Sequence, residues 1–365
     1  MLRVAVDATP LLGQRTGIGV LVHGLLAELA AREGLGLRAY ALTWRGRGEL
    51  EAVAPPGVAV ARAPMPAAAL ARVWTRADGP VIEWWTGRVD VVHGTNFVVP
   101  PARRAAEVVS VHDLTALRFP ELCQPATLRY PPLIRRAIGR GAWVHTLSQA
   151  MAAEIVDRLG APTERVRVVA PAVGPPAPPP AAAAAGRPYV LAIGRAEPRK
   201  DLPLLVRAFD RLAAVEPDLD LVIVGPVGWG EEALAAAIAA ARHRERIRRL
   251  GWVSDAAKPG LLAGAAVFAY PSVYEGFGIP PLEAMAAGVP VVATAAGGVP
   301  EAVGDAGLLV PVGDADALMA ALMQVLGDPA LRSRLVVAGR DRAAQFSWRR
   351  CADGIEALYR DAAAR

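Results

Sequence analysis

Residues 267–294 read VFAYPSVYEGFGIPPLEAMAAGVPVVAT. The apolar run 267–270 predicts a buried strand, and residues 289–294 predict a second one. Between them, Pro280 and Pro281 stand where the first turn of a helix tolerates proline. The order is therefore strand, turn, helix, strand. Strands that alternate with helices in this way lie parallel in one sheet, so the stretch predicts an α/β fold.

The turn of this stretch combines glycines with acids. Four residues lead into the helix: Gly276, Phe277, Gly278 and Ile279. Main-chain N–H groups at the start of a helix form a ready site for an anion. Glu275 and Glu283 stand on either side, with seven residues between them. Two carboxylates beside an anion site suit a ligand that also carries hydroxyls, as a nucleotide-diphosphate sugar does.

The stretch resembles the E-x7-E signature of retaining glycosyltransferases of family GT4, which have the GT-B fold. The resemblance implies two doubly wound, Rossmann-like α/β domains that face each other across a cleft. It also implies that Glu275 contacts the donor sugar, that Glu283 contacts the ribose and that residues 276–279 line the nucleotide site. The alternative is a first helical turn that carries acid only because of the helix dipole.

The length and composition predict two globular domains. The chain has 365 residues, of which 53% are hydrophobic and 21% charged, and this is more than one core usually supports. A segment rich in proline and alanine divides it, because proline interrupts both helices and sheets. The expected parts are an N-terminal acceptor-side domain (1–172), a linker (173–187) and a donor domain (188–345). The resemblance implies that a last helix (346–365) packs back on the first domain.

Short apolar runs alternate with helical stretches in both halves, which predicts a parallel sheet in each. The expected strands of the first half are 4–7, 38–43, 89–93, 108–112, 143–147 and 166–170. Those of the second half are 189–194, 221–225, 248–252, 265–270, 289–294 and 308–310. Ligands of such sheets bind at the carboxyl ends of the strands.

Arg195 and Lys200 follow the first strand of the second half. Two cations at this edge suit a diphosphate, arginine as a fork and lysine as a point charge. Lysine occurs only at Lys200 and Lys258 in a chain that otherwise uses arginine, so its presence carries weight. The segment is similar to the GT4 segment that holds the donor pyrophosphate. Arg195 and Lys200 occupy the matching positions and form the expected diphosphate clamp, and Arg199 lies outside this clamp. The alternative is a set of solvated loop charges.

Three further turns suit a donor site. Residues 251–254 resemble the base-binding turn of GT4, in which the main chain near Val253 meets the nucleobase. Gly17 and Gly19 precede a helical run, and a similar turn in GT4 faces the donor phosphate, although a tight helix entry is the alternative. The third glycine of a dinucleotide fingerprint is missing. Residues 297–301 form another turn, which suits either the donor site or a helix cap.

Two strands of the first half end in histidine. His112 and Asp113 are adjacent, and strand geometry points only one of them toward a ligand. A matching histidine in GT4 lies near the reacting sugar, and the His-Asp pair is typical of a mannosyltransferase-like branch. His93 and Asp113 are candidates for the acceptor pocket, with a structural role as the favoured alternative for His93. His145 belongs to no constellation that the sequence reveals.

No metal site is expected. The triplets 218–220 and 314–316 each place two aspartates one residue apart, a pattern that can hold Mg²⁺ or Mn²⁺ on a diphosphate. The first precedes a strand and therefore lies at its amino end, away from the ligand edge. The second precedes a helix and predicts an N-cap at Asp314. Transfer is therefore expected to be independent of metal.

The predicted function is retaining transfer of a hexosyl group, mannosyl favoured, from a nucleotide-diphosphate sugar. GDP-mannose is favoured over UDP-sugars as the donor, and no other cofactor is expected. The acceptor is a hydroxyl of a glycan, a lipid-linked molecule or a small molecule. A sugar-nucleotide epimerase or hydrolase, and an inactive nucleotide-sugar-binding scaffold, are the alternatives.

The formal charge of +5 is too diffuse to indicate nucleic acid as a partner. Residues 129–140 mix arginines with apolar residues, which suits peripheral contact with an anionic membrane or, more simply, a solvated helix face. The N-terminus carries no leader-like pattern, so a cytoplasmic protein is expected. Its two cysteines have no metal or redox spacing.

Overall fold

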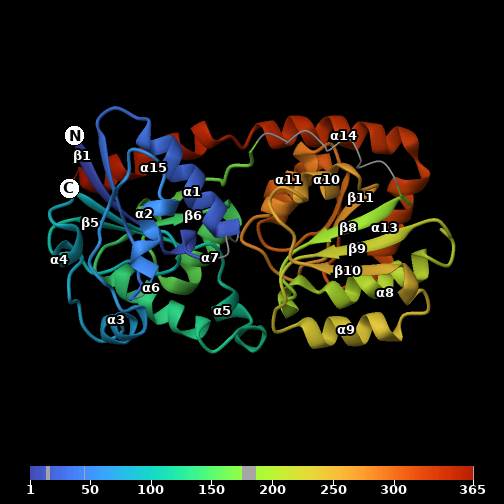
Figure 1. The fold of residues 1–365 in the computed structure, drawn as a ribbon, viewed down its shortest axis with the longest axis horizontal. Coiled ribbons are helices and arrows are strands. Elements are labelled where there is room, and N and C mark those ends of the chain that lie inside the picture. The colour runs from blue at the N-terminus through green and yellow to red at the C-terminus, as the bar shows by residue number, and fades with distance from the viewer. Residues whose placement is uncertain (14–16, 45, 175–185, 365) are drawn as a thin grey trace. The chain divides into compact units, whose positions relative to one another are not determined.

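The computed structural model describes residues 1–13, 17–44, 46–174 and 186–364. They form two compact units (Figure 1), one built from Met1–Ala172 and Ser347–Arg365, the other from Val173–Phe346. Residues 175–185 of the predicted linker lie outside the described residues. Each unit has its own parallel sheet with helices beside it, which confirms the predicted α/β architecture of two doubly wound halves.

The first unit contains a seven-stranded parallel sheet in the order β3-β2-β1-β4-β5-β6-β7. Its strands are β1 (Leu2–Asp7), β2 (Leu35–Tyr40), β3 (Ala59–Val60), β4 (Val91–Gly94), β5 (Ala106–Ser110), β6 (Trp143–Thr146) and β7 (Val166–Val168). Its helices are α1 (Gly17–Ala30), α2 (Leu50–Val53), α3 (Ala67–Trp74), α4 (Glu83–Thr86), α5 (Thr115–Arg118), α6 (Tyr130–Gly139), α7 (Gln149–Leu159) and α15 (Trp348–Ala363).

The second unit contains a six-stranded parallel sheet in the order β10-β9-β8-β11-β12-β13. Its strands are β8 (Tyr189–Ile193), β9 (Asp220–Val224), β10 (Ile247–Gly251), β11 (Val267–Tyr270), β12 (Val291–Thr294) and β13 (Leu308–Val310). Its helices are α8 (Leu202–Leu212), α9 (Glu231–Ala240), α10 (Lys258–Ala263), α11 (Ile279–Ala286), α12 (Val299–Val303), α13 (Ala315–Gly327) and α14 (Pro329–Ala344).

The order of strands reverses once in each sheet, between β1 and β4 and between β8 and β11. The chain leaves the two strands of each pair toward opposite edges of the sheet. The loops at the carboxyl ends of these two strands therefore diverge. Open α/β sheets bind ligands at such a point. The loops that follow β8 and β11 carry Lys200 and Glu275, so the reversal brings the two predicted donor segments to one place.

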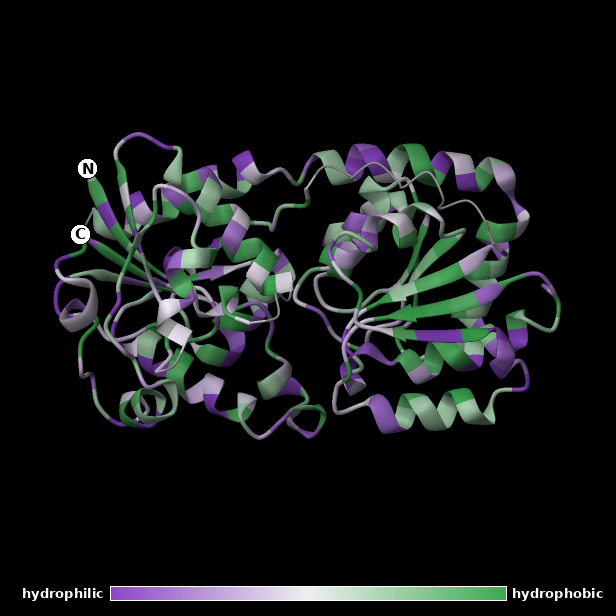
Figure 2. Cartoon of the chain, in the orientation of Figure 1, coloured by the Kyte–Doolittle hydropathy of each residue, from purple (hydrophilic) through white to green (hydrophobic). Residues whose placement is uncertain are grey.

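Burial explains why the runs found in the sequence become strands. Figure 2 shows β8 and β9 as largely hydrophobic ribbons, and Leu191, Val222 and Phe268 at the centre of the sheet are buried. Strands covered on both faces read as continuous apolar runs. Every predicted strand overlaps an observed one. β3 was missed because its two residues are too short to show any periodicity.

The last helix, α15, packs against α1 within the first unit. Gly24 of α1 makes the close approach possible, since a Cβ on this residue would lie 2.3 Å from the indole ring of Trp348. The buried face of α15 includes Ile355 and Tyr359. Tyr359 also joins the polar contacts described below.

Candidate functional site

Lys200 and Glu275 meet at the carboxyl edge of the second sheet. The Lys200 ammonium lies 2.5 Å from Glu275 Oε1 and 2.8 Å from the hydroxyl of Tyr270, the last residue of β11. Both charged residues are buried, with 9% and 7% of their surfaces exposed. A buried ion pair needs further hydrogen bonds to offset the loss of water. The contacts with Tyr270 and the neighbours of Glu275 provide them.

Arg199 and Ser272 complete the surroundings of the Glu275 carboxylate. The Arg199 guanidinium lies 2.6 Å from Oε2, and the Ser272 hydroxyl donates to Oε1 at 2.8 Å. Burial alone would raise the pKa of Glu275. The charges of Arg199 and Lys200, with hydrogen bonds from Lys200 and Ser272, outweigh burial and lower this pKa to about 2. Glu275 is therefore a carboxylate at neutral pH, able to accept hydrogen bonds from hydroxyls.

Arg195, which the sequence pairs with Lys200, lies in different surroundings. Its guanidinium is 3.7 Å from Glu197 and donates to the main-chain oxygen of Val227 at 3.3 Å. Its side chain is 37% exposed, so it remains accessible to an anion at the carboxyl end of β8. Arg199, which the sequence leaves outside the clamp, is the arginine that contacts Glu275.

Glu283 has a cation of its own. The Lys258 ammonium, in the first turn of α10, lies 2.6 Å from both of its carboxylate oxygens. The two lysines of the chain therefore pair one each with the two glutamates of the E-x7-E pattern. The rarity of lysine in the sequence draws attention to Lys258, but nothing in the sequence connects Lys258 with Glu283.

The backbone around Glu275 is held by glycines. Gly297 adopts a φ of +55°, and a Cβ there would lie 2.2 Å from the carbonyl oxygen of Glu275. Gly298 donates its N–H to the same oxygen at 2.9 Å. Gly278, at the start of α11, has a φ of +141°. These contacts fix the main chain from which the Glu275 side chain extends.

The remaining predicted donor residues occupy loops and helix ends. The ring of Phe277 is buried edge-on against Phe346, with centroids 5.4 Å apart, so its side chain belongs to the core. Val253 follows β10 in a partly exposed loop, and Ile279 begins α11. Gly17 and Gly19 lie inside α1, which begins at Gly17, so the prediction of a turn ahead of the helix was wrong. Residues 14–16, which directly precede this helix, lie outside the described residues.

A chain of buried hydrogen bonds crosses the first unit from α15 to the end of β7. His145 Nε2 lies 3.1 Å from the carbonyl of Val169, so this nitrogen must donate. Nδ1 of the neutral ring then accepts from Ser110 at 2.7 Å. Ser110 in turn accepts from His93 Nε2, and the Tyr359 hydroxyl donates to His93 Nδ1, each at 2.7 Å. All four bonds therefore run in one direction.

We call the hydrogen-bonded residues Tyr359, His93, Ser110 and His145 the relay. Burial keeps both of its histidines neutral. It lowers the pKa of His145 to about 4, and burial with the nearby His145 and His112 rings lowers the pKa of His93 well below its usual value. Both ring nitrogens of His93 are engaged inside the unit, which favours its structural role over an acceptor role. The interpretation of His145 as isolated was wrong, because its partners come from other strands.

We expect Tyr359→Phe to lower the free energy of unfolding by about 1–3 kcal/mol, because it leaves the buried Nδ1 of His93 without a donor. Urea denaturation followed by circular dichroism measures this. Tyr189→Phe is the matched control: it also loses one hydrogen bond, to the carbonyl of Leu261, but in a half-buried place that water reaches. Equal losses in the two variants would contradict the relay.

One of the two ring nitrogens of His112 is engaged in a buried hydrogen bond. Its Nε2 donates to the carbonyl of Thr95 at 2.7 Å, which leaves Nδ1 as the basic nitrogen. The ring of Phe97 meets it edge-on, with centroids 5.5 Å apart, and stacks on Tyr130 at 5.0 Å. Phe97 has a φ of +63°, a conformation that costs a bulky residue energy and is concentrated at functional sites. Asp113 accepts from the N–H of Thr115 at 2.9 Å and thus shapes the following turn.

The two aspartate triplets have structural partners. Asp314 caps α13 by accepting from the N–H of Ala317, which confirms the predicted N-cap. Asp316 pairs with Arg211, and Asp218 and Asp220 lie near Arg187. Across the described ranges, no cluster of three or more histidine, cysteine or acidic side chains could hold a metal ion.

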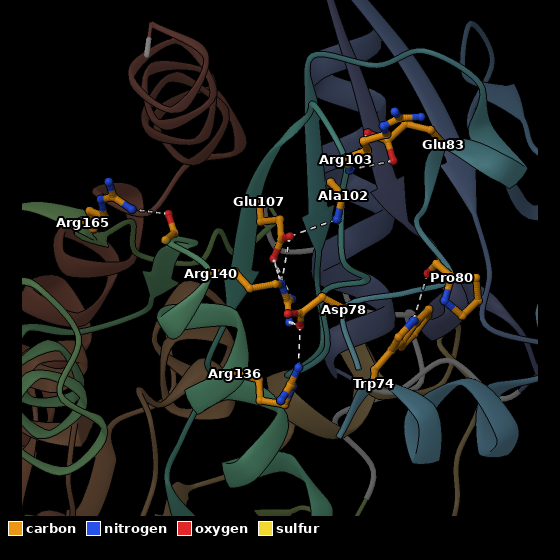
Figure 3. Close-up of polar contacts among 11 residues, drawn as sticks. Trp74, Asp78, Pro80, Glu83, Ala102, Arg103, Glu107, Arg136, Arg140 and Arg165 are labelled. Atoms are coloured by element: carbon orange, nitrogen blue, oxygen red, sulfur yellow. Dashed lines mark hydrogen bonds and ion pairs between the residues drawn. The ribbon is translucent and has the colours of Figure 1, made fainter. Parts of the chain in front are cut away.

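Arg136 of α6 and Arg140, which directly follows that helix, pair with acids of the first unit. Figure 3 shows Arg136 directed at Asp78, 2.6 Å away, and Arg140 directed at Glu107. Arg140 contacts Glu107 at 2.7 Å and 3.0 Å and also lies 3.3 Å from Asp78. Both arginines are paired with acids of the same unit, which favours a helix held by ion pairs over one that offers these two arginines to a membrane. In the described part of the chain, none of the helices is long and apolar enough to cross a bilayer.

Comparison with known proteins assigns the family. The sequence profile described as "Glycosyltransferase Family 4" matches residues 15–176, and that described as "Glycosyl transferases group 1" matches residues 178–342. The chain belongs to glycosyltransferase family 4. This glycosyltransferase is 34% identical to O-antigen chain mannosyltransferase B of Escherichia coli over 274 residues, 72% of this chain and 71% of the relative.

Further similar proteins cover different shares of the glycosyltransferase. It is 40% identical to phosphatidyl-myo-inositol mannosyltransferase of Mycolicibacterium smegmatis over 163 residues, 44% of this chain and 41% of that one. The solved structure of sucrose-phosphate synthase from Thermosynechococcus elongatus matches with a TM-score of 0.79, 21% identity and 99% coverage of both chains. HepE from Anabaena, in complex with UDP, matches with a TM-score of 0.74, 21% identity, and 99% and 100% coverage. These structures confirm the GT-B fold.

Proposed function

We propose that this glycosyltransferase moves a hexosyl group, mannosyl favoured, from a nucleotide-diphosphate sugar to a hydroxyl acceptor with retention of configuration. The observation that carries the proposal is the buried cluster in which Lys200 and Arg199 surround the ionised Glu275 at the reversal point of the second sheet. It combines a cation for phosphate with an acceptor for hydroxyls. The similarity to one mannosyltransferase over 72% of the chain supports the choice of sugar.

In this proposal, Arg195 and Lys200 neutralise the charge that develops on the departing diphosphate. Glu275 accepts a hydrogen bond from a hydroxyl of the donor sugar, and Glu283 accepts one from a hydroxyl of the ribose. The main chain at 276–279 and at Val253 borders the nucleotide. Gly17 and Gly19, in the first turn of α1, contribute main-chain N–H groups toward phosphate. His112 lies beside the reacting sugar, with Nδ1 as its basic nitrogen. The acceptor hydroxyl attacks from the side that the diphosphate leaves, and the diphosphate takes its proton.

The donor in this proposal is GDP-mannose, ahead of UDP-sugars, and the acceptor is a glycan, a lipid-linked molecule or a small molecule. The names of the bacterial relatives, an O-antigen and a phosphatidyl-inositol mannosyltransferase, support such acceptors. His93 and Asp113 remain acceptor candidates of lower rank, since both have partners inside the first unit. We infer a cytoplasmic protein with peripheral contact to the membrane where the acceptor is a lipid, and residues 173–187 as the linker between domains.

Two measurements test the proposal: protection against thermal unfolding by GDP- and UDP-sugars, and transfer of the radiolabelled sugar to added acceptors. We expect GDP-mannose to raise the unfolding temperature most, because a ligand of the native state stabilises by mass action. Transfer with retained configuration supports the proposal. Release of free sugar or its epimer without transfer supports the hydrolase or epimerase alternative, and protection without any turnover supports the scaffold.

We further expect the enzyme to transfer sugar at the same rate with and without EDTA. The positive charges of Lys200 and Arg195 stand at the carboxyl end of β8, where a diphosphate would otherwise need a divalent ion. Initial rates before and after chelation, and after addition of Mn²⁺, measure this. Loss of transfer on chelation with recovery by Mn²⁺ would refute the metal-independent mechanism.

A further inference from the structure

The Glu275 carboxylate is held by cations on both of its oxygens. Lys200 contacts Oε1 at 2.5 Å, and Arg199 contacts Oε2 at 2.6 Å. Lys200 and Ser272 both contact Oε1, and contacts to one oxygen alone would leave the carboxylate able to turn about its last side-chain bond. A second cation on the other oxygen fixes the orientation of the carboxylate, and hydrogen bonds to charged groups are the strong ones.

Arg199 is itself anchored by groups other than Glu275. Its Nε lies 3.1 Å from Glu197, and its guanidinium donates to the carbonyl of Tyr274 at 3.3 Å. Its own carbonyl accepts from the N–H of Val273 at 2.8 Å. Arg199 therefore ties the loop after β8 to the loop after β11 by main chain and side chain alike. Its guanidinium stays in place without depending on the carboxylate.

The two cations differ in what else they can contact. The Lys200 ammonium has three donor hydrogens, of which Tyr270 and Glu275 use two, so a third can point toward a phosphate oxygen. A diphosphate that accepted from this third hydrogen would share the charge of Lys200 with Glu275. The contact of Arg199 with Oε2 uses the other carboxylate oxygen and does not depend on Lys200.

We propose that Arg199 is a positioning residue of the transfer reaction: it holds Glu275 ionised and correctly oriented for the donor sugar, while Lys200 is shared with the diphosphate. The inference rests on the proposed function, since Glu275 must act on a donor for its orientation to affect a rate. It assigns the two neighbouring cations separate tasks, one acting on the carboxylate and the other on the leaving group.

The decisive variant is Arg199→Met, with Arg199→Lys as the conservative exchange. For Arg199→Met we expect kcat to fall by about 10²-fold, with a smaller change in KM for the donor, because Lys200 remains. The acid side of the kcat/KM profile should move to higher pH, since the pKa of Glu275 rises when the positive charge leaves. Arg199→Lys should restore part of kcat and the wild-type acid side.

Arg246→Met is the matched control. Arg246 is a buried arginine of the same unit, just ahead of β10, and it donates to the carbonyls of Glu216 and Pro217 at 2.9 Å. Its loss should lower stability while leaving the pH profile of kcat/KM as in the wild type. A pH profile of Arg199→Met equal to that of the wild type would overturn the inference, whatever happens to its stability.

A readout without turnover separates this inference from the proposed function. Carbon-13 NMR of labelled glutamate carboxyls, with Glu275 assigned through Glu275→Gln, follows ionisation directly. We expect no titration of Glu275 above about pH 3 in the wild type, and a titration at higher pH in Arg199→Met. If no nucleotide sugar is turned over, the proposed function is wrong while the titration still decides the role of Arg199. An unshifted titration overturns that role even in an active enzyme.

Discussion

Lys200→Ala is expected to reduce sugar transfer at least about 10²–10³-fold, because the proposed diphosphate site loses a buried positive charge. The Lys200 ammonium is held between Tyr270 and Glu275, so it is oriented before the donor binds. Preorganised charge in a site of low water content stabilises a developing charge far more than charge in bulk solvent. Initial rates at saturating donor and calorimetric titration with nucleotide sugar measure both parts of the effect.

The same substitution should leave the fold intact. Glu275 keeps Arg199 and Ser272 as partners, so its charge is not stranded when Lys200 is removed. Circular dichroism and the unfolding temperature test this point. The matched variant is Lys200→Arg, which retains the charge but replaces an ammonium with a larger planar fork, and it should retain part of the activity. Transfer by Lys200→Ala at more than about a tenth of the wild-type rate would refute the role of Lys200 in the clamp.

The cluster around Glu275 shows what local sequence can and cannot predict. Glu275 was found because a strand, a glycine turn and a helix with prolines in its first turn leave a clear pattern. The sequence places Arg199 outside the expected clamp although it is adjacent to Lys200, because the direction of a loop side chain depends on the turn. Here Asp201 adopts a φ of +41° and caps α8, and the preceding turn directs Arg199 and Lys200 to the same carboxylate. Asp201 has a φ that few residues other than glycine adopt, so the turn was not predictable.

The hydrogen-bonded histidines of the first unit show the same limit over longer distances. The apolar runs predicted β4, β5 and β6, and therefore the strands that carry His93, Ser110 and His145. Their hydrogen bonds depend on the register of three parallel strands, with Ser110 paired opposite His145. Tyr359 joins them from α15, and it lies 266 residues after His93 in the chain. Periodicity describes which face of a strand is buried, but it does not say which polar groups meet there.

Acid should destabilise the first unit through this relay. Burial lowers the pKa of His145 from 6.5 to about 4 in the folded chain, so between these two pH values the unfolded chain binds a proton that the folded chain does not. Stability therefore falls as the pH falls. Linkage gives a loss of about 2 kcal/mol from His145 between about pH 7.5 and about pH 5. His93, whose pKa is also lowered, adds to it. Asp7 acts in the opposite direction, since burial raises its pKa to about 6 and the folded chain takes up the extra proton.

A comparison of variants isolates the histidine from Asp7. His145→Gln keeps a donor and an acceptor but has no titratable nitrogen, so it should be less stable at about pH 7.5 and lose about 2 kcal/mol less than the wild type on going to about pH 5. Ser110→Ala breaks the same relay without removing a titratable group, so it should be destabilised while its stability changes with pH as that of the wild type does. Urea denaturation at several pH values measures all three proteins. A wild-type pH dependence in His145→Gln would show that the buried imidazole is not the group that titrates, because Asp7 is present in all of them and its effect cancels in the differences.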